Sequence, residues 1–211
     1  YPTSNTKIAL NINPIDTTAL RVPAYLKEKK LNDSETIQAF EELLDFVFSQ
    51  MPNSEIASLS IGNEVDIYLG NDAKKWKEFQ EFFEQTSNHA RQKKPGLKVG
   101  VKATFKGLME RKELQELNSN SDVVLATYYP LNDDFTVKEP KIVREDFAML
   151  AQAYAGREVY FLEAGFPSSS ANSSSELKQA EFVREVFKAW DEQKEQVKLV
   201  NFVWMNERSQ Q

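Results

Sequence analysis

The sequence contains no cysteine and only one histidine, His89. The lack of cysteine excludes disulfide bonds, zinc sites built on thiolates and cysteine nucleophiles, although it leaves the cellular compartment open. Because His89 lies in a charged helical stretch, where a solvated side chain is expected, the sequence argues against a Ser-His-Asp triad and against a histidine-rich metal site. Any chemistry must therefore come from other side chains.

Basic residues and long apolar runs are also scarce. The 26 Lys and Arg are outnumbered by 32 Asp and Glu, which gives a net charge of −6 and no basic stripe. This balance argues against nucleic acid as a partner. No apolar run approaches the roughly 18 residues of a membrane span. A composition of 41% hydrophobic and 27% charged residues is typical of an ordinary globular domain.

What the sequence does contain is a regular alternation of two kinds of segment. Near-continuous apolar runs of strand length, as expected for parallel strands covered on both faces, occur at 7–12, 56–62, 97–103, 122–129, 158–164 and 199–205. Segments with helical periodicity lie between them, at 34–51, 72–92, 107–117, 140–155 and 174–193. Strand followed by helix, repeated, predicts parallel β/α units.

The spacing of the units indicates which parallel fold to expect. From residue 56 onward the strands start 25 to 41 residues apart, which fits the roughly 31 residues per unit of a (β/α)₈ barrel. A doubly wound sheet is the rival, but no strand is followed by a glycine-rich phosphate turn, and the chain has only 7 glycines. Because six strands are visible and not eight, we expect an α/β fold of the TIM (β/α)₈-barrel type, as a partial barrel of about six units in one domain over residues 1–211. The outer strands of such an open barrel are unpaired apolar edges, so we expect them either to pair edge to edge in a homodimer or to be covered by a segment that is missing from this chain.

Two of the predicted strands end in a glutamate. LSIGNEVD (59–66) places Glu64 after Gly62 and Asn63, and YFLEAGFPSSS places Glu163 before a Gly-Phe-Pro turn. A buried, unpaired charge costs several kcal/mol, so such a glutamate is paired, exposed at the strand end, or functional. For Glu64 alone an ordinary salt bridge is the simpler interpretation. The second glutamate follows 99 residues later, which is three units of about 33, so a barrel would set the two carboxylates facing each other across its mouth. Two carboxylates across a cleft are the minimum equipment for glycoside hydrolysis.

This pair of strand ends resembles glycoside hydrolase clan A. The stretch GNEV is similar to one in the endo-β-1,4-galactanases and the plant-type endo-β-1,3-glucanases, and EAGFPS resembles a Glu-Thr-Gly-Trp-Pro-Ser segment of the latter. Ala164 and Phe166 stand where those glucanases have Thr and Trp. The resemblance implies retaining (β/α)₈ enzymes with the acid/base after strand 4 and the nucleophile after strand 7. On that alignment the six strands of this chain are strands 3 to 8.

The resemblance also implies roles for individual residues. Glu64 would be the acid/base, Glu163 the nucleophile, and Asn63 the partner of the sugar 2-hydroxyl. One of the two adjacent tyrosines, Tyr128 or Tyr129, would hydrogen-bond the nucleophile. Because side chains alternate along a strand, only one of them faces the mouth of the barrel, and we favour Tyr129. The remaining candidates for substrate binding are Tyr128, Tyr129, Trp204 and Phe166. The tryptophan would form a sugar-stacking floor; packing in the core is the alternative for it, and packing in the core or the wall is the alternative for the two tyrosines.

The function implied is a retaining β-glycoside hydrolase that acts on a polysaccharide or oligosaccharide by double displacement, without a cofactor or metal. The expected partner is a carbohydrate substrate, and the resemblance favours a secreted or periplasmic location. The alternative is a non-catalytic carbohydrate-binding or scaffold domain derived from such a barrel. A metal-dependent lyase is a third class, and it predicts several carboxylates converging at ligand distances.

Overall fold

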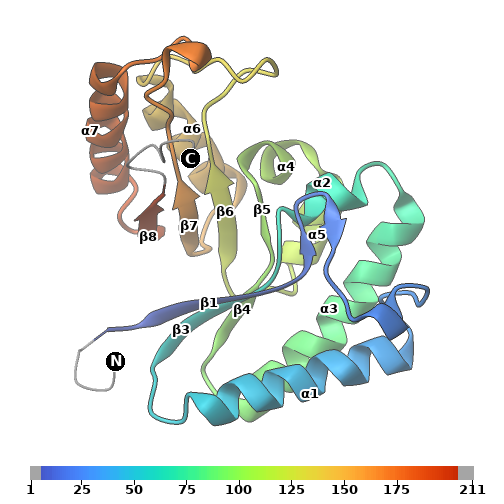
Figure 1. The fold of residues 1–211 in the computed structure, drawn as a ribbon. Helices are drawn as coiled ribbons and strands as arrows, with labels where there is room; N and C mark the ends of the chain where they lie inside the picture. Colours follow the sequence, from blue (N-terminus) through green and yellow to red (C-terminus); the bar gives the residue numbers. More distant parts are fainter. Residues whose placement is uncertain (1–5, 204–211) are drawn as a thin grey trace. The chain divides into compact units, whose positions relative to one another are not determined.

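The computed structural model describes residues 6–203, in two compact units that divide between Val123 and Val124 (Figure 1). Both units are α/β, and all six predicted strands and the predicted helices are present within a few residues of the expected bounds. The predicted strand 97–103 is interrupted at Val101, and the predicted helix 107–117 breaks at Arg111. The α/β class with parallel strands is confirmed, whereas one domain over residues 1–211 stays a prediction.

The elements of unit 1 are β1 (Ile8–Asp16), β2 (Ala19–Leu20), η1 (Ala24–Leu26), α1 (Ser34–Gln50), β3 (Ile56–Asn63), α2 (Val65–Leu69), α3 (Ala73–Lys93), β4 (Lys98–Gly100), β5 (Lys102–Thr104), α4 (Phe105–Glu110) and α5 (Lys112–Asn118). Those of unit 2 are β6 (Val124–Tyr128), α6 (Ile142–Ala153), β7 (Val159–Ala164), η2 (Ser170–Asn172), α7 (Glu176–Glu192) and β8 (Val197–Phe202).

In unit 1 the central strand is β3, which pairs in parallel with β1 on one side and with β4 on the other. A register shift between Ile12 and Asp16 brings Asp16 opposite Asn63. The short strand β2 runs antiparallel to the last residues of β1, a hairpin that no sequence pattern indicated. The pairing of β1 with β3 sets the ends of these two strands side by side.

The core of unit 1 is aromatic. Figure 1 shows α1 and α3 side by side on one face of the sheet, and Phe40 of α1 meets Phe82 of α3 edge to face with ring centres 5.1 Å apart. Phe79 and Phe83 of α3 are also fully buried. Their spacing of three and four residues puts these rings on one side of the helix, so burial of this stripe holds α3 against the sheet and α1.

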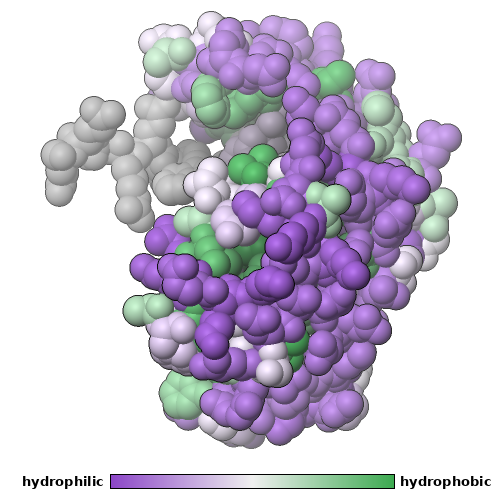
Figure 2. Space-filling model, turned by 90° about the vertical axis from the view of Figure 1, so that its right-hand side faces the viewer, coloured by the Kyte–Doolittle hydropathy of each residue, from purple (hydrophilic) through white to green (hydrophobic). Residues whose placement is uncertain are grey.

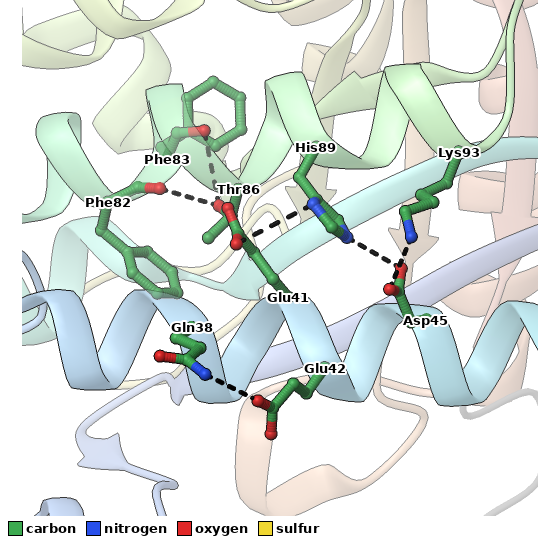
Figure 3. Close-up of polar contacts among 9 residues, drawn as sticks. All are labelled: Gln38, Glu41, Glu42, Asp45, Phe82, Phe83, Thr86, His89 and Lys93. Atoms are coloured by element: carbon green, nitrogen blue, oxygen red, sulfur yellow. Dashed lines mark hydrogen bonds and ion pairs between the residues drawn. The ribbon is translucent and has the colours of Figure 1, made fainter.

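Polar contacts among His89, Asp45 and Lys93 also join the two helices (Figure 3). His89 Nε2 lies 2.8 Å from Asp45 Oδ1, and Lys93 Nζ donates to Asp45 Oδ2 at 2.7 Å. The other ring nitrogen of His89 is 3.8 Å from a carboxylate oxygen of Glu41. The expectation of a solvated His89 was therefore wrong: its side chain is only 19% exposed, because α1 lies against this side of α3.

Unit 2 is built around β7, which pairs in parallel with β6 and β8. A shift in the β6–β7 register after Ala126 brings Thr127 opposite Glu163. The helices α6 and α7 lie next to each other (Figure 1). Phe147 of α6 stacks on Phe161 of β7 at 4.0 Å between ring centres, so an aromatic core also fixes this sheet.

The exposed positions of the helices are mostly polar, with apolar exceptions such as Phe46 and Phe187. On the face drawn in Figure 2, hydrophilic side chains dominate and apolar ones form small patches among them. No helix within residues 6–203 combines the length and the hydropathy needed to cross a lipid bilayer.

Candidate functional site

Glu64 is the first residue beyond β3, and its backbone has an unusual conformation. Its φ of 46° and ψ of 46° are left-handed, which costs a residue with a side chain about 1–3 kcal/mol. Gly62, two residues earlier, has φ 97°, and a Cβ there would lie 2.5 Å from a methyl carbon of Val65. The chain therefore turns sharply from β3 into α2 at Glu64.

The end of β1 provides a hydrogen-bond donor to this glutamate. The hydroxyl of Thr17 donates to Glu64 Oε2 at 2.8 Å, and the Thr17 backbone N–H donates to the carbonyl of Asn63 at 2.9 Å. Thr17 is itself left-handed, with φ 53°. Two non-glycine residues in this conformation, hydrogen-bonded to each other at adjacent strand ends, are typical of a functional site.

Asn63 completes this network. Its amide nitrogen donates to Asp16 Oδ1 at 2.9 Å and to the hydroxyl of Thr17 at 3.3 Å. Asp16 in turn lies 3.6 Å from Arg21, so the loop arginine forms an ion pair there. The buried amide oxygen of Asn63 has no hydrogen-bond partner among the described residues. Since a buried acceptor without a donor costs free energy, this oxygen is suited to a ligand hydroxyl.

Asp66 is fixed inside unit 1 and is not a surface carboxylate. It is 4% exposed and accepts hydrogen bonds from the backbone N–H and the hydroxyl of Thr104, at 2.9 and 2.6 Å. A Cβ at Gly107 would come within 2.4 Å of Asp66 Oδ2. Burial raises the pKa of Asp66, against the opposing effect of the Thr104 hydrogen bonds. Asp66 therefore anchors the start of α2, directly after Glu64, to β5 and α4.

Glu163 lies inside β7, near its end, and the residue after β6 donates a hydrogen bond to it. The phenol of Tyr129 donates to Glu163 Oε2 at 2.6 Å. A Cβ at Gly165 would lie 2.4 Å from the Tyr129 ring, so the ring fits against the chain only because residue 165 is glycine. Of the two adjacent tyrosines, Tyr129 is the one beside the glutamate.

Tyr128 points to the opposite side of β6, as strand alternation requires. It is 1% exposed, and its hydroxyl donates to Asp146 Oδ2 at 2.6 Å within unit 2. Its ring lies among those of Phe147, Phe161 and Phe182. Burial raises the pKa of the Tyr128 phenol. Tyr128 is therefore a core residue, which corrects its assignment as a substrate-binding candidate.

Phe166 requires the same correction. It is 2% exposed and stacks on Phe182 of α7 with ring centres 5.0 Å apart, so no face of it is open to a sugar. The glucanase-like position of Phe166 in the sequence therefore corresponds to a packing role here. Trp204 lies outside the described residues.

Two residues beside the glutamates were not found from the sequence: Thr17 and Gly165. No local pattern marks them, because their partners are distant in sequence and meet only when the strands pair. Within residues 6–203 no group of three or more His, Cys, Asp or Glu side chains is placed to hold a metal ion.

Comparison with known proteins places the fold. No protein-family model matches the sequence, and no curated protein matches it. Among solved structures, the chain is similar to the GH53 catalytic domain of Ignisphaera aggregans, with a TM-score of 0.68 and 15% identity over 89% of this chain and 58% of that one. It is also similar to a fungal β-1,4-galactanase, with a TM-score of 0.66 and 15% identity over 93% of this chain and 67% of that one.

A third similar structure is an active-site mutant of the Rhizomucor miehei β-1,3-glucanosyltransferase in complex with laminaritriose. The TM-score is 0.61 and the identity 15%, over 81% of this chain and 62% of that one. The chain thus spans less than two thirds of the length of this structure and of the GH53 domain. The resemblance to the galactanases and glucanases noted in the sequence is confirmed at the level of fold: the chain has the β/α fold of the clan A barrels.

Proposed function

We propose that this protein is a retaining β-glycoside hydrolase that acts on a polysaccharide or oligosaccharide by double displacement. The observation that carries the proposal is that each unit holds one glutamate at the carboxyl end of a parallel strand, with a hydroxyl hydrogen-bonded to it. In barrel enzymes this end of the strands carries the catalytic groups. The similar structures named as β-1,4-galactanase and β-1,3-glucanosyltransferase support a β-linked glycan as substrate.

In the proposed first step, a carboxylate oxygen of Glu163 attacks the anomeric carbon. The bond from this carbon to the leaving oxygen breaks, and Glu64 gives its proton to that oxygen. Water then attacks the anomeric carbon of the glycosyl-enzyme, Glu64 takes a proton from the water, and Glu163 is released as a carboxylate. Both steps invert the anomeric centre, so the product keeps the configuration of the substrate.

The surrounding residues support these roles. The Tyr129 hydroxyl donates a hydrogen bond to Glu163 Oε2, which holds the carboxylate in a fixed orientation. The unpartnered amide oxygen of Asn63 accepts a hydrogen bond from a sugar hydroxyl next to the reacting carbon. No cofactor takes part in this scheme.

The test is hydrolysis of a panel of β-1,3- and β-1,4-linked glucans and galactans, with proton NMR of the first product. We expect retention of configuration, and loss of turnover by at least about 10²–10⁴-fold in Glu64→Gln and in Glu163→Gln. The matched controls are Glu84→Gln in unit 1 and Glu195→Gln in unit 2, because both side chains are exposed. Binding of a glycan with no hydrolysis would instead identify a carbohydrate-binding domain. Unchanged turnover in Glu163→Gln would refute the mechanism.

The edge-to-edge homodimer is a separate proposal about unit 1. Within this unit, β2 covers the outer edge of β1 only at Ile15 and Asp16. The remaining apolar edge favours pairing with a second copy. Sedimentation of the protein at several concentrations tests this, and a monomer throughout would contradict it.

A further inference from the structure

Thr17 has a conformation that its side chain makes costly. It is β-branched, and φ values above zero are true outliers for such residues. Glycine or asparagine would occupy this position more easily. The strain therefore needs a compensating contact, and within residues 6–203 the side-chain hydrogen bonds of Thr17 lead to Asn63 and Glu64.

These hydrogen bonds have a defined direction. A threonine hydroxyl has one proton to donate, and here it points to Glu64 Oε2 at 2.8 Å. The hydroxyl oxygen of Thr17 itself accepts a hydrogen bond from the amide nitrogen of Asn63 at 3.3 Å, and the other proton of this amide goes to Asp16 Oδ1 at 2.9 Å. A single chain of hydrogen bonds thus runs from Asn63 through Thr17 to Glu64.

We propose that Thr17 is the positioning residue of the acid/base. Its hydroxyl fixes the side chains of Glu64 and Asn63 relative to each other, and it keeps Glu64 Oε2 as a hydrogen-bond acceptor. This inference rests on the proposed function of Glu64. The Thr17 proton on Oε2 limits the rotation of the Glu64 carboxyl and so fixes the direction in which this carboxyl can give its proton to the leaving oxygen. Thr17 touches no reacting atom and acts through Glu64.

Three variants separate this role from a structural one. Thr17→Val keeps the shape and the branched Cβ but removes the hydroxyl, and Thr17→Ser keeps the hydroxyl. Thr18→Val is the matched control, because it makes the same change at the adjacent residue, whose side chain is exposed. Thermal unfolding of each variant shows whether it is folded.

The decisive measurement compares two substrates. One is an unactivated β-linked oligosaccharide, whose leaving oxygen needs a proton; the other is a dinitrophenyl glycoside, whose leaving group departs without one. With the oligosaccharide, we expect Thr17→Val to lower kcat by about 10–100-fold, the loss of one hydrogen bond to a charged group, with little change in KM. With the dinitrophenyl glycoside, we expect less than about a threefold loss in the glycosylation step. Thr17→Ser should restore most of kcat, and Thr18→Val should match the parent protein.

Equal losses in Thr17→Val and Thr17→Ser, or equal losses on both substrates, would overturn the inference. A second measurement needs no activity. Crystal structures of the Thr17 variants should show the Glu64 carboxyl reoriented in Thr17→Val and unmoved in Thr17→Ser; an unmoved carboxyl in both would also overturn it. If the parent protein hydrolyses no glycoside, the proposed function fails, and these crystal structures alone decide the role of Thr17.

Discussion

In each unit a hydroxyl from the neighbouring strand end donates a hydrogen bond to the glutamate, but the two glutamates lie on segments of different backbone conformation. In each, the donor is the first residue past the neighbouring parallel strand: Thr17 after β1, and Tyr129 after β6. Both donors contact the Oε2 atom of their glutamate. However, Glu64 lies beyond its strand in a left-handed turn, whereas Glu163 lies within β7.

This difference shows what each site depends on. The direction of Glu64 is set by backbone torsions, and so it needs Gly62 before it and α2 after it. The direction of Glu163 is set by strand alternation, and it needs space for the ring of its donor beside Gly165. The orientation of Glu64 in unit 1 therefore depends on backbone conformation, whereas the orientation of Glu163 in unit 2 depends on side-chain packing.

The largest expected effect separates the chemical roles of the two glutamates. Glu163→Ala removes the nucleophile, so it should lose activity on every glycoside by more than about 10⁴-fold. Glu64→Ala should retain the glycosylation step with a dinitrophenyl glycoside, because that leaving group needs no proton. Pre-steady-state release of dinitrophenol measures this step. A full burst in Glu163→Ala would show that the roles are assigned the wrong way round.

Next in size is the contrast between the two glycines. Gly62→Ala adds a clash with Val65 to a left-handed backbone, so we expect it to cost more than Gly165→Ala, which adds only a clash with Tyr129. Overpacking alone costs about 1–3 kcal/mol, and the left-handed backbone adds about 1–2 kcal/mol. Urea unfolding measures both free energies, with Gly96→Ala as a control for a positive φ without a clash. Equal costs would contradict the distinction between conformation and packing.

The adjacent tyrosines should divide stability from activity. Tyr128→Phe leaves the buried Asp146 carboxyl without its phenol donor, so the free energy of unfolding of unit 2 should fall by about 1–3 kcal/mol. Tyr129→Phe should leave the unfolding free energy nearly unchanged and lower kcat, because the Glu163 carboxylate loses its orienting donor. Thermal unfolding and steady-state kinetics of both variants test this division, and a reversed pattern would exclude it.

The smallest effect concerns the polar contacts between neighbouring helices in each unit. Hydrogen bonds from Lys93 and then His89 lower the pKa of the Asp45 carboxyl below its ordinary value of 3.8. The stabilisation from Asp45 is therefore fully present above pH 3.8 and is lost as the pH falls through the lower folded-state pKa. Asp45→Asn should lower the midpoint of thermal unfolding slightly at pH 6, and the difference should vanish in stronger acid. Glu192→Gln, which breaks the exposed α6–α7 ion pair with Arg144, is the corresponding change in unit 2. A constant difference at all pH values would mean that the carboxylate of Asp45 is not the cause.

Much of the fold followed from the sequence, because its signals are local. Apolar runs bounded by polar loops marked every parallel strand, and segments with helical periodicity marked the helices between them. The hairpin of β2 and the break at Arg111 were not predicted, since two-residue pairings and single-residue kinks leave no periodic pattern.

The candidate site was only half visible in the sequence. Glu64 and Glu163 stand out because a carboxylate ending an apolar run is costly unless it has a use. Strand alternation already favoured Tyr129 over Tyr128, whereas Phe166 was misassigned because a family-like position in the sequence does not report burial. The roles of both glutamates stay predictions until activity is measured.

The sequence by itself determined the parallel β/α elements and the two strand-end glutamates, because these depend on side chains that are neighbours along the chain. Only the tertiary structure decided which groups hold those glutamates. Thr17 meets Glu64 across 47 residues, and Tyr129 meets Glu163 across 34. Such partners are selected by strand register, which depends on the packing of whole units.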